Sequence, residues 1–156
     1  MIYYRSDVRR SGVNSRALIA AAKKLLAAAG ESDASLSVSL VGDAAIRELN
    51  REHRGKDSAT DVLSFAIEPE FNGATNGSAP ERMLGDVVIS VDTARRQADG
   101  YDATLQDELY RLLIHGILHV LGHDHERVDE RRAMEREERR LAGTIELAWP
   151  YETAPS

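Results

Sequence analysis

Four of the chain's five histidines fall within eleven residues, from His115 to His125. His115, His119, Gly122 and His125 reproduce the H-x-x-x-H-x-x-G-x-x-H spacing of one class of zinc hydrolases. Histidines four apart on a helix share a face, so two imidazoles can approach one ion. A glycine can then end the helix and let the chain turn back with a third ligand. Three protein nitrogens leave one position of a tetrahedral zinc ion free for water, which is typical of a catalytic site.

The third ligand must be chosen between His123 and His125. If the helix continued, His115 and His123 would be about 12 Å apart along its axis, at about 1.5 Å of rise per residue. Nitrogens that share a zinc ion each lie about 2 Å from it, so such a straight row cannot close on one ion. We therefore expect the ligands to be His115, His119 and His125. His123 is expected at the rim, and Asp124 beside an imidazole whose N–H it can accept.

The chain contains no cysteine, so a transition-metal site must be built from His, Asp and Glu. We expect one zinc ion per chain, although three imidazoles also suit nickel, cobalt or copper. Zinc peptidases with this spacing carry a glutamate directly after the first histidine as general base, and Gly116 occupies that position here. Glycine cannot transfer a proton, so the pattern argues against a peptidase.

The elements that must position these residues follow from the spacing of apolar side chains. Alternating or apolar runs predict strands at 2–5, 36–41, 60–67 and 86–91. Helices are predicted at 15–29, 43–50, 92–98, 105–121 and 128–142, with Ser15, Asp43 and Thr104 as candidate caps. The range 69–82 is rich in Gly, Asn, Ser and Ala, which predicts a mobile loop.

The order of these elements predicts a single α+β domain over residues 1–156, with a small mixed sheet packed against helices. The histidine helix is apolar almost all round from Leu109 to Leu121, which predicts a central, buried helix carrying two of the ligands, as in zincins. Charges lie in the first residues where a signal peptide needs an apolar core, and no run is long enough to span a bilayer. We expect a cytoplasmic protein without membrane contact.

The net charge of −6 argues against a general nucleic-acid coat but leaves room for a local basic groove. Candidates for such a groove form two clusters: Arg5, Arg9 and Arg10, and Arg47, Arg51, Arg54 and Lys56. Each cluster is also compatible with ordinary solvated surface, because lysine and arginine are mostly exposed.

Three segments give the chain a family likeness: residues 50–54 leading into Thr-Asp-Val-Leu-Ser-Phe at 60–65, Gly-Asp-Val-Val-Ile-Ser at 85–90, and the histidine run. In these segments the chain resembles the YbeY family of bacterial rRNA-maturation endoribonucleases. Met134 and Glu138 also lie where that family tends to keep a Met and a Glu. The resemblance implies a zinc-dependent nuclease acting on single-stranded RNA, with a role in small-subunit rRNA maturation and ribosome quality control. Its partners would be rRNA and the small ribosomal subunit.

The resemblance also implies roles for individual residues. His115, His119 and His125 match the family's metal ligands, with His115 counted in the catalytic centre, and Arg54 matches its catalytic-cleft arginine. Within the matched segment, Thr60, Asp61 and Ser64 are candidates for the cleft. His123 stands where the family usually has Tyr.

Two alternatives remain open from the sequence. One is a metal-dependent peptidase or amidase whose base is Asp124 or Glu126. The other is a non-catalytic ribosome-assembly factor in which zinc only stabilises a binding surface.

Overall fold

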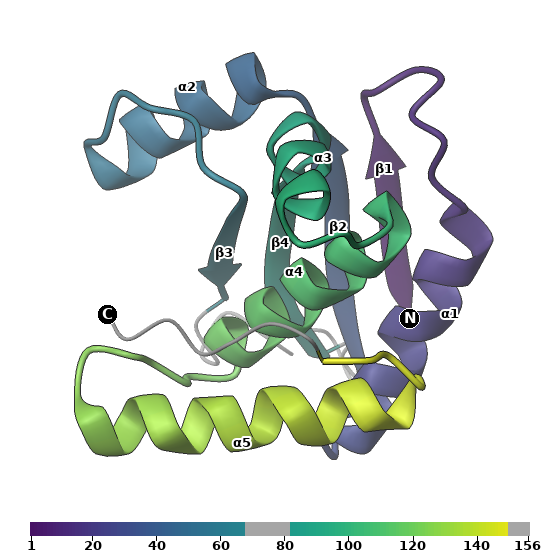
Figure 1. Ribbon diagram of the computed structural model, residues 1–156. Helices are drawn as coiled ribbons and strands as arrows, with labels where there is room; N and C mark the ends of the chain where they lie inside the picture. The colour runs from purple at the N-terminus through teal and green to yellow at the C-terminus, as the bar shows by residue number, and fades with distance from the viewer. Residues whose placement is uncertain (68–81, 150–156) are drawn as a thin grey trace, which may run out of the picture.

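Four strands form one mixed sheet, in the order β1-β2-β4-β3 (Figure 1). The computed structural model describes residues 1–67 and 82–149. The strands are Ile2–Ser6 (β1), Ala34–Val41 (β2), Val62–Ala66 (β3) and Arg82–Ser90 (β4). β1, β2 and β4 are parallel, and β3 pairs antiparallel with β4. The expected α+β class with a small mixed sheet is confirmed.

Five helices accompany the sheet in the described ranges: Ser15–Ala28 (α1), Asp43–Arg54 (α2), Val91–Gly100 (α3), Leu105–Val120 (α4) and Val128–Thr144 (α5). Each corresponds to a helix expected from the sequence. None of them is long and apolar enough to cross a membrane. The loop expected at 69–82 lies outside the described residues, except for Arg82, which belongs to β4.

Two helix caps differ from the expectation. Asn14 caps α1 instead of Ser15, and Gly42 precedes α2 where Asp43 was expected as the cap. Asparagine and serine are comparable caps, so adjacent candidates could not be separated by type. The Asp43 carboxylate instead accepts a hydrogen bond from the Ser90 hydroxyl at 2.7 Å, which ties the start of α2 to the end of β4.

Strand β4 begins at Arg82, four residues before the expected start at Asp86. Its pairing with β2 is irregular between these two points, and Gly85 lies in the irregular stretch. A Cβ at Gly85 would lie 2.2 Å from the carbonyl oxygen of Phe65, so only glycine allows β3 to come this close. Gly85 lies outside both the loop expected at 69–82 and the strand expected at 86–91, and in the structure it permits a close backbone approach within β4.

The helices lie on both faces of the sheet. Val87 and Ile89 of β4 belong to the main core with α1, α4 and α5, whereas Val88 packs with Ile46 of α2 on the opposite face. This division follows from the alternation of side chains along a strand. In Figure 1, α4 crosses the sheet, and α5 runs below the strands and packs against α4 and α1. Helix α4 has nine buried residues among its sixteen, which confirms the expected central helix.

Candidate metal centre and cleft

The histidine helix ends in a turn that redirects the chain. Gly122 has a φ of 99°, in the left-handed region that glycine tolerates. Its N–H donates to the carbonyl of His119 at 3.0 Å, and the N–H of His123 donates to the carbonyl of Leu118 at 2.9 Å. This pair of bonds is the Schellman arrangement that closes a helix. The chain therefore reverses within two residues, as the spacing predicted.

The reversal brings three imidazoles together. His115, His119 and His125 each offer a nitrogen, and these nitrogens all lie within 4.8 Å of one another. The Nε2 atoms of His115 and His119 are 3.1 Å apart. Two of the rings are partly buried at the end of α4, and the His125 ring is exposed on the loop. These three histidines could hold a metal ion.

The electrostatics of the cluster favour a neutral imidazole at His119. Burial, together with the neighbouring His115 and His125 rings, lowers the pKa of His119 to about 4. His119 is therefore uncharged at neutral pH, and its free electron pair is available to a metal ion.

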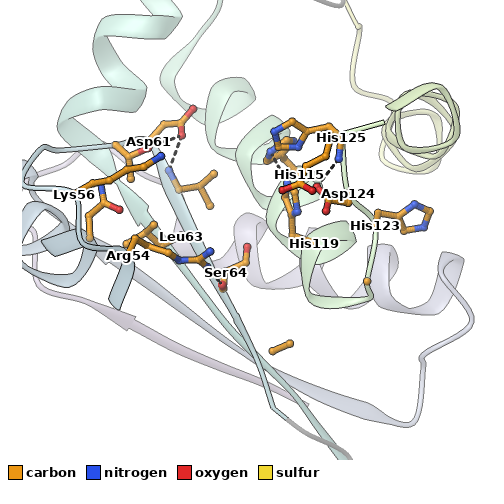
Figure 2. Close-up of a pocket in the computed structure, with 16 residues that line it drawn as sticks. Arg54, Lys56, Asp61, Leu63, Ser64, His115, His119, His123, Asp124 and His125 are labelled. Carbon is orange, nitrogen blue, oxygen red and sulfur yellow. Dashed lines mark hydrogen bonds between the residues drawn. The ribbon is translucent and has the colours of Figure 1, made fainter. Parts of the chain in front are cut away.

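His123 and Asp124 lie in the reversing loop and line the same cavity as the three histidines. In Figure 2 the His123 ring points away from the other three imidazoles. The Oδ1 atom of Asp124 accepts a hydrogen bond from the backbone N–H of His125 at 2.7 Å, which stiffens the loop. Asp124 thus accepts a hydrogen bond from a backbone N–H. From the sequence, an imidazole N–H was the expected donor.

A carboxylate from another helix faces an imidazole instead. The Oε2 atom of Glu138, on α5, lies 3.6 Å from Nδ1 of His115, and the Glu138 side chain is only 13% exposed. The family resemblance had singled out Glu138 without assigning it a role in the site. The available signal was helical spacing, since Glu138 lies four residues after Met134 and three before Leu141, both of which are buried.

Across the cavity from the histidines, Arg54 ends α2 and reaches over β3 (Figure 2). Its Nη2 donates to the backbone carbonyl of Ser64 at 2.7 Å, and its guanidinium carbon lies 5.6 Å from the centre of the Phe65 ring. One N–H and one face of the guanidinium are thereby held by the protein. The remaining donors of the fork are available to an anion in the cavity.

The other basic residues of α2 are not equivalent to Arg54. Arg47 forms a two-point ion pair with Asp57, with N···O distances of 2.8 and 3.1 Å, and Arg51 pairs with Glu48. Lys56 follows Gly55, whose φ of 68° ends α2, and it lines the cavity with Arg54. Of this second basic cluster, Arg54 at the end of α2 and Lys56 just after it therefore line the cavity.

The three candidate cleft residues of the segment 60–65 all line the cavity. Oδ1 of Asp61 accepts the backbone N–H of Val62 at 2.8 Å, and Oδ2 accepts from Gln97 at 3.2 Å. Asp61 is thus engaged by protein donors on both oxygens. The Ser64 hydroxyl donates to the carbonyl of Gly116 at 3.1 Å, which joins β3 to α4 beside His115.

Gly116 has a structural explanation. A Cβ at this position would lie 2.6 Å from Cγ1 of Val87 and 3.2 Å from the Ser64 hydroxyl. Position 116 therefore points at the sheet, and no side chain fits there without a shift. A glutamate could not occupy this position as the general base of a peptidase.

The cavity between these two walls has a volume of about 910 Å³. It lies between the end of α2 with β3 on one side and the end of α4 with its loop on the other. That volume is within the range of small-molecule sites, which is about 300–1,000 Å³. The cavity therefore contains both the three-histidine cluster and an oriented guanidinium that can bind an anion.

Comparison with known proteins identifies the family of this chain. The family model described as endoribonuclease YbeY matches residues 5–146. The chain belongs to the YbeY endoribonuclease family. As a YbeY endoribonuclease, it is a hydrolase that acts on phosphodiester bonds in RNA.

Relatives named endoribonuclease YbeY support this membership. The one from Anaeromyxobacter sp. strain Fw109-5 is 53% identical over 138 residues, covering 88% of this chain and 68% of the relative. The one from Anaeromyxobacter dehalogenans is 54% identical over 128 residues, covering 81% of this chain and 62% of that longer protein. The one from Geobacter metallireducens is 45% identical over 141 residues, covering 88% of this chain and 91% of the relative.

The fold has also been seen before. A solution structure of a Thermotoga maritima protein matches with a TM-score of 0.58 and 24% identity, over 99% of this chain and 98% of that one. At this identity the match supports the architecture alone. Together with the family match, it confirms the α+β fold expected from the sequence.

Proposed function

We propose that this YbeY-family chain cleaves single-stranded RNA with a zinc ion held by His115, His119 and His125, and with Arg54 binding the scissile phosphate. The observation that carries the proposal is the convergence of three imidazole nitrogens within 4.8 Å in the cavity that Arg54 also lines. Nickel or another divalent transition ion would suit the same donors.

The residues fit the ion by their chemistry as well as their spacing. Three neutral imidazoles are a common donor set of catalytic zinc, and they leave a coordination position for a reactant. When bound, the ion would supply Lewis-acid chemistry and activate water near neutral pH. Such activation reduces the need for a strong protein base next to the first histidine, where Gly116 stands.

Arg54 would supply the electrostatic part of catalysis. A phosphodiester gains negative charge on its non-bridging oxygens as it is attacked, and a guanidinium can donate to two of them. The bond from Nη2 to the Ser64 carbonyl fixes the orientation of the fork before substrate arrives. Such preorganisation lowers the cost of ordering the side chain during the reaction.

The expected preference for single-stranded RNA comes from the family resemblance. The reacting phosphate must reach the histidines between the α2–β3 wall and the α4 loop. An unpaired strand can splay its bases and expose a phosphate to the cavity, whereas pairing and stacking hold a duplex in a fixed helix. The family resemblance extends the proposal to rRNA of the small ribosomal subunit, and hence to the cytoplasm.

The test is to incubate zinc-loaded protein with an unstructured RNA, the same sequence in a duplex, and casein. We expect internal cleavage of the unstructured RNA, abolished by a chelator, and little or none of the other two. Arg54→Ala should lower turnover by about 100-fold, the typical effect of losing one preorganised donor, with zinc content unchanged.

Arg47→Ala is the matched control, because Arg47 lies on the same helix but is paired with Asp57 outside the cavity. It should leave turnover unchanged. Full activity of Arg54→Ala would remove the phosphate-binding role, and cleavage that persists without any metal would overturn the proposal.

A further inference from the structure

Glu138 is a carboxylate on α5 that faces the metal cluster from outside the histidine motif. Its Oε2 atom lies 3.6 Å from Nδ1 of His115, and the two side chains are 13% and 29% exposed. We infer that Glu138 is a positioning residue: it accepts the Nδ1–H of His115 and so holds the Nε2 atom of that ring toward the metal. The inference rests on the proposed metal centre and adds a residue to it.

The geometry of the rings decides which nitrogen carries the proton. Nε2 of His115 faces Nε2 of His119 at 3.1 Å, so the metal side of His115 is Nε2. A ligating nitrogen must be deprotonated, and a neutral imidazole then carries its proton on the other nitrogen. That nitrogen, Nδ1, is the one that faces Glu138. At 3.6 Å the two atoms are just beyond hydrogen-bond distance. We expect the contact to shorten to a hydrogen bond when a metal fixes the ring, which would orient the imidazole and raise its basicity as a ligand.

The packing of α5 keeps the carboxylate in place. Met134 and Leu141 are buried on the same side of the helix as Glu138, one turn before and one turn after it. The neighbouring Glu137 faces elsewhere and pairs with Arg140 at 2.7 Å, with about a third of its side chain exposed. Docking of α5 through apolar contacts therefore sets the position of one carboxylate and leaves the next at the surface.

Asp124 is another carboxylate close to the cluster. Its Oδ1 atom already accepts the backbone N–H of His125 at 2.7 Å. Asp124 thus shapes the loop that carries the third imidazole, whereas Glu138 orients the first.

The test is zinc affinity, measured on metal-free protein by competition with a chromophoric chelator. Glu138→Ala should raise the Kd for zinc by 10- to 100-fold, the usual effect of losing such a partner. Glu138→Gln keeps an oxygen acceptor and should recover part of that loss. Glu137→Ala is the matched control and should bind zinc like the unchanged chain. Thermal unfolding of each metal-free variant shows whether the fold is kept.

The outcomes separate this inference from the proposed function. If the unchanged chain binds zinc and Glu138→Ala binds it equally well, the positioning role is overturned while the metal centre stands. If Glu137→Ala loses as much affinity as Glu138→Ala, the effect is one of general charge and the role is again overturned. Failure of the unchanged chain to bind any transition ion would overturn the metal centre and, with it, the inference.

Discussion

Gly116 offers the sharpest test of how the central helix packs on the sheet. In Gly116→Ala, the new methyl carbon would lie 2.6 Å from Cγ1 and 3.1 Å from Cγ2 of Val87. Carbon atoms prefer about 3.5–4.0 Å, so helix and strand must separate by about 1 Å. Val87 is fully buried and its branched side chain is stiff, so it cannot turn aside.

The expected cost follows from two opposing effects. Overpacking of a core costs about 1–3 kcal/mol, and the rigidity of Val87 places this site in the upper part of that range. Alanine in place of glycine within a helix regains about 1 kcal/mol. We therefore expect Gly116→Ala to lower the free energy of unfolding by about 1–2 kcal/mol. For a domain of this size, that corresponds to a fall in Tm of about 2–8 °C.

The assay is urea and thermal unfolding, with two controls. Gly143→Ala lies in the last turn of α5, and a Cβ there meets nothing within 4 Å, so this variant should gain up to about 1 kcal/mol. In a Val87→Ala background, Gly116→Ala should become neutral or stabilising, because the clashing methyl groups are gone. If Gly116→Ala and Gly143→Ala stabilised the chain equally, the close approach of α4 to β4 would be refuted.

Three further predictions concern the site. Gly122→Ala forces a side chain into a backbone with φ of 99°. It should lower the free energy of unfolding by about 1–2 kcal/mol, measured in urea, and should also weaken zinc binding. An unchanged free energy of unfolding and an unchanged zinc affinity would contradict the helix-end turn. Ser64→Ala removes the donor to the Gly116 carbonyl and should cost about 1 kcal/mol by the same assay, whereas no loss would make that bond dispensable. Metal-free protein should lose stability as the pH falls from about 6.5 to 4. Burial lowers the pKa of His119 to about 4 in the folded chain, so the unfolded chain takes up this proton first. If the Tm of the unchanged chain varied with pH across this window no more than that of His119→Phe, the shift would be contradicted.

The histidine cluster could be predicted because all of its residues lie within one short segment of the sequence. Residues 115–125 contain both the helix spacing and the glycine that ends the helix, so the ligand cluster could be derived without the fold. The helices were also predictable, because apolar periodicity over three or more turns is a strong signal. Errors at Asn14 and Gly42 were shifts of one residue at helix starts, where neighbouring residues are comparable caps.

What could not be predicted depends on contacts between distant segments. Glu138 meets His115 only because α5 packs along α4, and its position in a highly charged helix made it resemble a solvated residue. Arg47 and Arg54 look alike in sequence, yet one is neutralised by Asp57 and the other faces the cavity. Gly116 was interpreted as the loss of a general base, whereas the fold shows that its lack of a side chain also serves packing.

The three imidazoles are not held equally, and this sets the order in which the ion would be captured and lost. His115 and His119 project from a helix embedded in the core, so the packing of α4 fixes the positions of both rings. His125 is exposed on the loop that follows, beyond the turn at Gly122. An ion would therefore find its first two ligands on the helix and gain the third from the loop. A competing chelator would reach the exposed His125 ring before the two partly buried rings, so loss of the ion would begin at the loop.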